Sequence, residues 1–147
     1  MKRLLLLLAA PVLAMPASAA AQKTTLEFRP IVPCAATARP LALKNSDEKF
    51  CVAPELIADL SNVTAARAGY VYGNEAIRIT LDNAAAARMK AATAADGVRI
   101  GILLDGALVS APTVHGPVSK EVEVDFGEHG PGLQKIAAAL QAGMGKK

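Results

Sequence analysis

Histidine and cysteine are scarce in this chain, which has two of each among its 147 residues. The histidines, His115 and His129, lie in glycine- and proline-containing loops, without the i, i+4 or strand-alternate spacing of metal ligands. The sequence also lacks a G-x-S-x-G elbow around a nucleophilic serine and a glycine-rich loop that could hold phosphate. We therefore predict no catalytic residue, no metal site and no cofactor, and we expect that the chain is not an enzyme.

Long apolar runs are also few, and the clearest one lies near the N-terminus. Two basic residues precede an apolar segment that ends near Ala14, and a small-residue stretch follows. A bilayer span needs ~20 apolar residues, so this shorter pattern is typical of a secretory signal peptide rather than of the alternative, a membrane anchor. We predict that residues 1–21 are the signal peptide, cut after Ala19 or Ala21. Residues 22–147 then form a single periplasmic domain without a membrane span.

An excess of positive charge is missing from the exported part. The chain has sixteen basic and thirteen acidic residues, and two of the basic ones, Lys2 and Arg3, belong to the predicted signal peptide. The remaining charges of both signs are interspersed along the sequence, whereas a nucleic-acid partner requires a concentrated basic face. We therefore expect no nucleic-acid partner.

The two cysteines, Cys34 and Cys51, both lie in the predicted exported domain. An even pair in an oxidising compartment is typical of a disulfide. The alternative is a redox or metal pair, but the C-x-x-C spacing and the nearby histidines of such sites are missing. We predict a structural disulfide, worth ~3 kcal/mol in the chain-entropy model of a loop of this size.

A strand from Val98 to Leu104 is predicted to be the centre of the fold. Val98, Ile100, Ile102 and Leu104 fall on one face and Gly101 and Leu103 on the other, so both faces are apolar enough to be covered. Such a strand is covered on both sides. Asp105-Gly106 favours a type I′ turn, and the returning strand ends at Pro112, which has no amide hydrogen for a ladder.

The other segments indicate further strands and two main helices. Two runs flank a second hairpin signal at Gly73-Asn74, and the acidic and apolar residues of Glu121 to Phe126 alternate as in a strand with one solvated face. Residues 84–93 and 133–142 have helical composition or spacing. We predict an α+β domain, with an antiparallel or mixed sheet and helices packed mainly on one face. Tyr70 and Tyr72 share a side, where they either cap a sheet edge or form a stacking surface.

One succession of segments resembles a known family. It consists of Ile77 to Asp82, a helix with Met89, the strand and turn ending in Asp105-Gly106, then Ser110-Ala111-Pro112, and a last helix that closes at Gly143. Together these resemble the head of the first large periplasmic domain of SecD and SecDF, accessory subunits of the protein translocase. The resemblance implies an α+β head fold, in which Asp105, Gly106, Ser110, Ala111 and Pro112 form a structural family motif. It also implies a function connected with protein export.

Some features depart from that family. The Cys34–Cys51 loop is not part of the resemblance. SecD also has transmembrane helices that couple export to an ion gradient, and we expect none in the exported domain here.

The leading functional hypothesis is a non-catalytic exported module that contacts extended, unfolded polypeptide or an envelope protein. Strand addition at an exposed edge is the expected mode, with Leu26 to Val32, interrupted by Pro30, or Val118 to Phe126 as the edge. Two alternatives stay open. One is a small metal- or histidine-dependent hydrolase that uses His115 and His129 with Asp125 or Glu128, and the other is a purely structural envelope protein.

Overall fold

The computed structural model describes residues 23–35, 38–125 and 133–144. The predicted signal peptide, Phe126, Glu128 and His129 lie outside the described residues. The strands are β1 (Leu26–Val32), β2 (Arg39–Ala42), β3 (Lys49–Val52), β4 (Ala58–Asp59), β5 (Val63–Val71), β6 (Asn74–Leu81), β7 (Val98–Leu104), β8 (Ala107–Ser110), β9 (Thr113–Val114) and β10 (Glu121–Asp125). The helices are the short 3-10 helix η1 (Leu60–Asn62), α1 (Asn83–Ala92) and α2 (Leu133–Met144).

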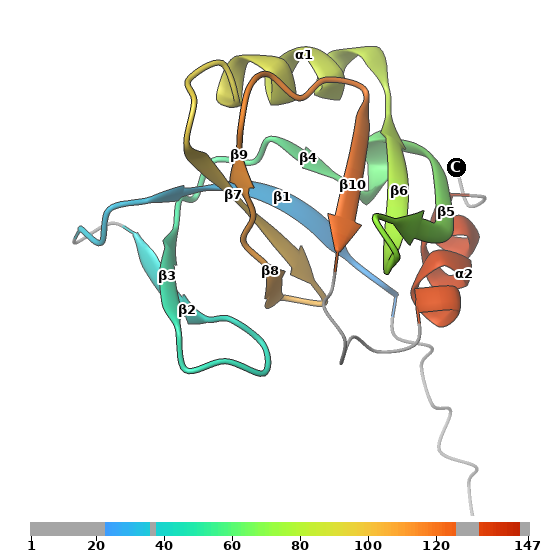
Figure 1. Cartoon of the computed structure of the whole chain (residues 1–147), viewed down its shortest axis with the longest axis horizontal. Coiled ribbons are helices and arrows are strands. Elements are labelled where there is room, and N and C mark those ends of the chain that lie inside the picture. The colour runs from blue at the N-terminus through green and yellow to red at the C-terminus, as the bar shows by residue number, and fades with distance from the viewer. Residues whose placement is uncertain (1–22, 36–37, 126–132, 145–147) are drawn as a thin grey trace, which may run out of the picture.

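The strands form two sheets rather than the single predicted sheet (Figure 1). The larger has the order β2-β3-β1-β7-β8, with β4 added to β1 and β9 to β7, and the smaller has the order β10-β6-β5. All pairings between these strands are antiparallel. The fold is therefore mostly antiparallel sheet with two α-helices, as the predicted α+β class requires, although the helix content is low.

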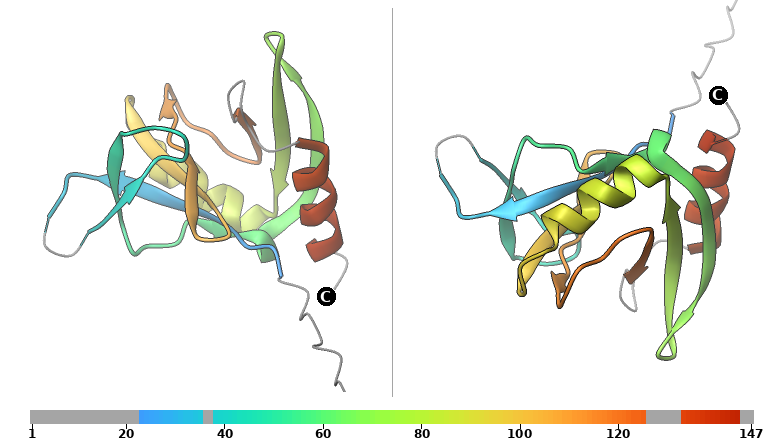
Figure 2. Two further views of the ribbon diagram at one scale, coloured as in Figure 1. Left: turned by 90° about the horizontal axis from the view of Figure 1, so that it is seen from below. Right: turned by 90° about the horizontal axis from the view of Figure 1, so that it is seen from above.

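The two helices accompany different sheets, so the prediction that they pack mainly on one face is too simple. Figure 2 shows α2 running alongside β5 and β6, while α1 lies across β1 and β7. Met89 of α1 and Leu140 of α2 are 1% exposed and belong to one large core. The side chain of Asp82 caps α1 by accepting a hydrogen bond from the Ala85 amide at 2.8 Å, as expected for an N-cap aspartate.

Strand β7 is covered on both faces, as its sequence predicts. Ile100 and Ile102 are 4% and 1% exposed and belong to the large core, which also contains Phe28. Leu103, on the opposite face, is 5% exposed and packs in a second core with Val52 and Leu108. The two cores thus share β7 as their common wall.

The second core is enclosed because the strands around it curl towards each other. A parallel bridge between Leu43 and Leu108 joins the segment after β2 to β8, and the Lys44 amide donates to the Leu108 carbonyl at 2.8 Å. Gly101 allows the tight packing inside this curl. A Cβ atom at Gly101 would lie 2.9 Å from Ile31 Cδ1 and 3.2 Å from Leu108 Cδ1.

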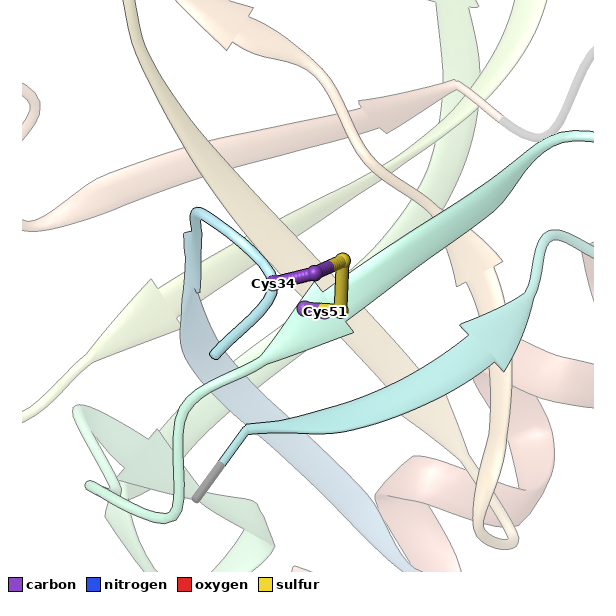
Figure 3. Close-up of a disulfide and its surroundings, with 2 residues drawn as sticks. All are labelled: Cys34 and Cys51. Atoms are coloured by element: carbon purple, nitrogen blue, oxygen red, sulfur yellow. A yellow bond between two sulfur atoms is a disulfide. The ribbon is translucent and has the colours of Figure 1, made fainter. Parts of the chain in front are cut away.

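The disulfide between Cys34 and Cys51 is present and fixes the chain after β1 to β3 (Figure 3). The two Cα atoms are 5.1 Å apart, and the residues are separated by 17 positions in the sequence. Cys51 is buried and precedes Val52 of the second core, whereas Cys34 is exposed. The bridge therefore holds the β2–β3 hairpin against β1.

The prediction that residues 26–32 form an edge strand is wrong, because β1 lies inside the larger sheet between β7 and the pair β3 and β4. The carbonyl of Pro30 accepts a hydrogen bond from the Ala53 amide at 3.0 Å. In a strand the N–H and C=O of one residue point to the same side, so the amide that Pro30 lacks would face this side too. Because β3 ends just before Ala53 and β4 begins only at Ala58, the missing donor falls in a gap between two strands.

Two tight turns have the backbone that hairpins favour. Asp105 and Gly106 have φ values of 50° and 82°, as predicted for a type I′ turn. The second turn is centred on Tyr72 and Gly73, with φ values of 49° and 85°. It lies one residue earlier than the sequence predicts and places a tyrosine in the left-handed region.

Candidate functional site

A cleft of about 630 Å³ lies between the edge of the smaller sheet and the larger sheet. Its floor is apolar and is formed by Phe28, Met89, Ile100 and Ile102. Residues 112–115, in and beside β9, line one wall, and residues 121–123 of β10 line the other. Figure 1 shows β9 and β10 in orange, joined by a loop that passes close to α1.

The β10 wall presents an open strand edge to this cleft. Among the described strands, β10 pairs only with β6. Glu121 lies opposite Thr80, and the Leu81 amide donates to the Lys120 carbonyl at 2.8 Å. In this register Lys120 and Val122 direct their backbone groups towards β6. The N–H and C=O groups of Glu121 and Glu123 therefore point away from the sheet.

The β9 wall also directs backbone groups away from its partner. The Ile100 amide donates to the Pro112 carbonyl at 3.3 Å, and the Gly97 amide donates to the Val114 carbonyl at 3.0 Å. Thr113, between these two carbonyls, lies opposite Arg99 in a pair without mutual backbone bonds. Its N–H and C=O groups therefore face away from β7.

Two side chains limit how much of the smaller sheet is open. The Ser110 hydroxyl donates to the Asp125 carbonyl at 3.3 Å, which occupies the outer edge of β10 at its end. On the opposite edge, the Gln141 amide group of α2 donates to the Ala66 carbonyl of β5 at 2.6 Å. The open stretch of β10 is thus short and centred on Glu121 to Glu123.

Charge is concentrated on the solvated face of β10. The Arg78 guanidinium binds Glu123 Oε1 through Nε at 3.0 Å and through a terminal nitrogen at 2.5 Å. The hydrogen bond and the charge of Glu123, with a smaller contribution from Glu121, raise the pKa of Arg78. Glu121 itself is exposed and makes no salt bridge with another described residue. This face therefore carries a carboxylate that a ligand cation can reach.

The loop between β9 and β10 is fixed by Thr93, the fully buried residue that follows α1. The Thr93 hydroxyl accepts a hydrogen bond from the Val118 amide at 2.8 Å. The same oxygen lies 2.8 Å from the Met89 carbonyl and 3.2 Å from the Val118 carbonyl. Val118 lines the cleft, so α1 determines where this part of the cleft wall sits.

The tyrosines lie at the tip of the β5–β6 hairpin, which projects beyond the rest of the molecule (Figure 2). Tyr72 is fully exposed and reaches the mouth of the cleft, and Tyr70 is 75% exposed. Tyr70 lies opposite Glu75, near the end of the strand pairing. The two predicted roles for the tyrosines are to cap a sheet edge or to form a stacking surface for a ligand. Tyr72 lies at the cleft, where its ring is available for stacking.

The residues of the hydrolase alternative are only partly described. His115 lines the cleft, and its Nδ1 atom lies 3.3 Å from Asp96 Oδ1, with both side chains more than three quarters exposed. His129 and Glu128 lie outside the described residues. Within the described part of the chain, no three or more His, Cys, Asp or Glu side chains are grouped as metal ligands.

The five residues predicted to form a family motif lie in the turn between β7 and β8, at the end of β8 and in the segment that leads to β9. Asp105 Oδ1 accepts a hydrogen bond from the Thr25 amide at 2.8 Å, and the Asp105 amide donates to the Thr25 carbonyl at 3.0 Å. Gly106 completes the turn, Ser110 binds β10, Ala111 follows β8, and Pro112 lines the cleft. Ser110 and Pro112 thus connect the β9 and β10 walls, whereas no pattern in the sequence indicates Thr93 or the cleft.

No helix in the described part of the chain has both the length and the apolar character that crossing a membrane requires.

Comparison with known proteins identifies related folds. The model of the family described as "SecDF, P1 head subdomain" matches residues 37–144. No curated protein matches the chain. A structure of SecDF, described as a membrane component that enhances protein export, is similar with a TM-score of 0.62 and 17% sequence identity, covering 83% of this chain and 64% of that chain. A structure of SecDF in a super-membrane-facing form gives a TM-score of 0.63 and 18% identity, covering 83% of this chain and 19% of that chain.

Proposed function

Because this chain belongs to the SecDF P1 head subdomain family, we propose that it is a non-catalytic accessory module of protein export that binds extended polypeptide. Binding takes place in the cleft between β9 and β10. A polypeptide segment adds to the open edge of β10, with the backbone groups of Glu121 and Glu123 as its hydrogen-bond partners. The side chain of the bound segment that lies opposite Val122, between these two backbone contacts, faces the apolar floor.

The observation that carries this proposal is the open edge of β10 beside an apolar floor. Strand addition takes affinity from main-chain hydrogen bonds, which every polypeptide can make, and takes selectivity from pockets for alternate side chains. Each backbone bond contributes about 0.5–1.5 kcal/mol net, and the open stretch of β10 offers bonds at only two residues. The expected affinity is therefore modest, which suits a client that must be released.

The cellular setting is part of the same proposal. Residues 1–21 are removed as a signal peptide, and residues 22–147 act as one domain in the periplasm. The Cys34–Cys51 disulfide supports an oxidising compartment outside the cytoplasm. The family membership supports a role in export, with unfolded clients or an envelope protein that offers an extended segment as the partner.

A proline substitution tests the proposal at a single amide. The N–H of Glu121 points away from β6, so Glu121→Pro removes a donor for the ligand without removing a bond within the sheet. Anisotropy of a fluorescently labelled, reduced and permanently unfolded client is the measurement. We expect Glu121→Pro to weaken binding at least severalfold, while the melting temperature stays near that of the unsubstituted protein.

Two variants make this experiment specific. Like Glu121→Pro, Glu121→Gln removes the carboxylate charge, but it retains the backbone N–H. It is expected to keep most of the binding. Val122→Pro removes an amide directed towards β6, and it is expected to destabilise the fold. Unchanged client binding by folded Glu121→Pro would reject strand addition at β10, and no binding by the unsubstituted protein would reject the proposed function.

A further inference from the structure

The charges around the open edge of β10 specify which extended segments fit it best. We infer that the cleft prefers segments in which basic and apolar residues alternate. This inference rests on the proposed function, because it adds a sequence preference to the same cleft.

The alternation follows from the pleat of β10. Glu121 and Glu123 point to the solvated face, where Arg78 also lies. Val122 points to the other face and packs against the large core that contains Phe28 and Ile102. A strand added to β10 repeats this alternation, because residues directly opposite each other in neighbouring strands share a face. One set of its side chains therefore meets carboxylates, and the other set meets the apolar floor.

The favoured charge is positive because the acidic side chains near the cleft are only partly compensated. Glu123 is bound by Arg78, whereas Glu121 makes no salt bridge within the described residues. Across the cleft, Asp96 lies 3.3 Å from His115, which lines the opposite wall. Opposite charges that face each other across a strand pair are favourable, and like charges are unfavourable. A lysine or arginine opposite Glu121 is thus favoured, and a glutamate there is disfavoured.

Three labelled nine-residue peptides test this preference. Each alternates valine with one polar residue, which is lysine, glutamine or glutamate, so apolar content and backbone are matched. We expect the lysine peptide to bind the purified protein about two- to fivefold tighter than the glutamine peptide, and the glutamate peptide to bind weaker by a similar factor. The ratio of lysine-peptide to glutamine-peptide affinity should fall when the salt concentration is raised from about 50 to about 500 mM. At the higher concentration the Debye length is well below about 10 Å, so exposed charges attract each other less.

Charge variants locate the effect. Glu121→Gln should bring the lysine to glutamine ratio close to one. Glu48→Gln makes the same charge change on the exposed turn between β2 and β3, and it should leave the ratio unchanged. Arg78→Gln releases Glu123 from its ion pair, so it should raise the affinity for the lysine peptide, whereas damage to the fold would lower the affinity for all three peptides.

The outcomes separate this inference from the proposed function. Equal binding of the lysine and glutamine peptides, or a ratio that Glu121→Gln does not change, would overturn the charge preference while strand addition stands. Failure of all three peptides and of the unfolded client to bind would overturn both. A lysine preference that disappears in Glu121→Gln and persists in Glu48→Gln would support the inference.

Discussion

The buried hydroxyl of Thr93 is a direct link between helix α1 and Val118, in the loop that joins β9 to β10. Thr93 has 0% exposure, so water cannot replace this partner. The loop that forms one side of the cleft therefore takes its position from the end of a helix that belongs to the large core. Such a connection allows the cleft wall to be rigid although it lies on a loop.

Replacing Thr93 by valine should destabilise the protein and loosen the cleft. The two side chains have a similar shape, but valine leaves the Val118 amide without its acceptor, and a buried unsatisfied group costs about 1–3 kcal/mol. Urea denaturation measures the loss of stability, and hydrogen exchange at the Val118 amide measures its local protection. Thr93→Ser keeps the hydroxyl and is the control. Equal protection of Val118 in both variants would contradict the proposed role of Thr93.

Gly101→Ala should be destabilising because β7 has no room for a methyl group. The added Cβ would meet Ile31 Cδ1 at 2.9 Å and Leu108 Cδ1 at 3.2 Å in the second core. Overpacking of this kind costs about 1–3 kcal/mol. Gly69→Ala is the matched control, since no atom of the described residues lies within 4 Å of a Cβ placed there. Thermal denaturation of both variants decides the prediction, and equal melting temperatures would refute it.

The sequence predicts β7 well because the information is local. After Arg99, every residue from Ile100 to Leu104 is apolar or glycine, which indicates a strand buried on two faces, and residues 100–103 are all buried in the structure. The Asp105-Gly106 turn is predicted for the same reason, since its positive φ values favour particular residues at two adjacent positions.

The edge assignments were less predictable, because they depend on which segments meet. Pro30 favours an edge strand, yet β1 tolerates it inside the sheet where β3 ends and β4 has not begun. The cleft depends on the relative placement of β9 and β10, and on the contact of Thr93 with Val118, 25 residues further along the chain. No periodicity or motif in either segment encodes that distance in space.

Tyr72→Asn should make the protein more stable and a weaker binder. Tyr72 has a φ of 49°, in a region that costs a non-glycine residue about 1–2 kcal/mol and that asparagine visits more readily. Its side chain is fully exposed, so little packing is lost. The ring at the cleft mouth is lost, however, and affinity for the unfolded client should fall. Tyr72→Phe keeps the ring and the strain, so it should retain both properties, and a stability gain there would contradict the explanation.

Reduction of the Cys34–Cys51 disulfide should loosen the second core more than the cleft. The bridge holds β3 beside β1, and β3 contributes Val52 to the second core, whereas the cleft floor belongs to the large core. In the chain-entropy model a loop of this size is worth ~3 kcal/mol, so reductant should lower the urea midpoint of the unsubstituted protein. A double variant, Cys34→Ser with Cys51→Ala, should start from that lower midpoint and not respond to reductant. Hydrogen exchange should rise in β2 and β3 while Ile100 and Ile102 stay protected, and a uniform rise across both cores would show that the two cores unfold as one unit.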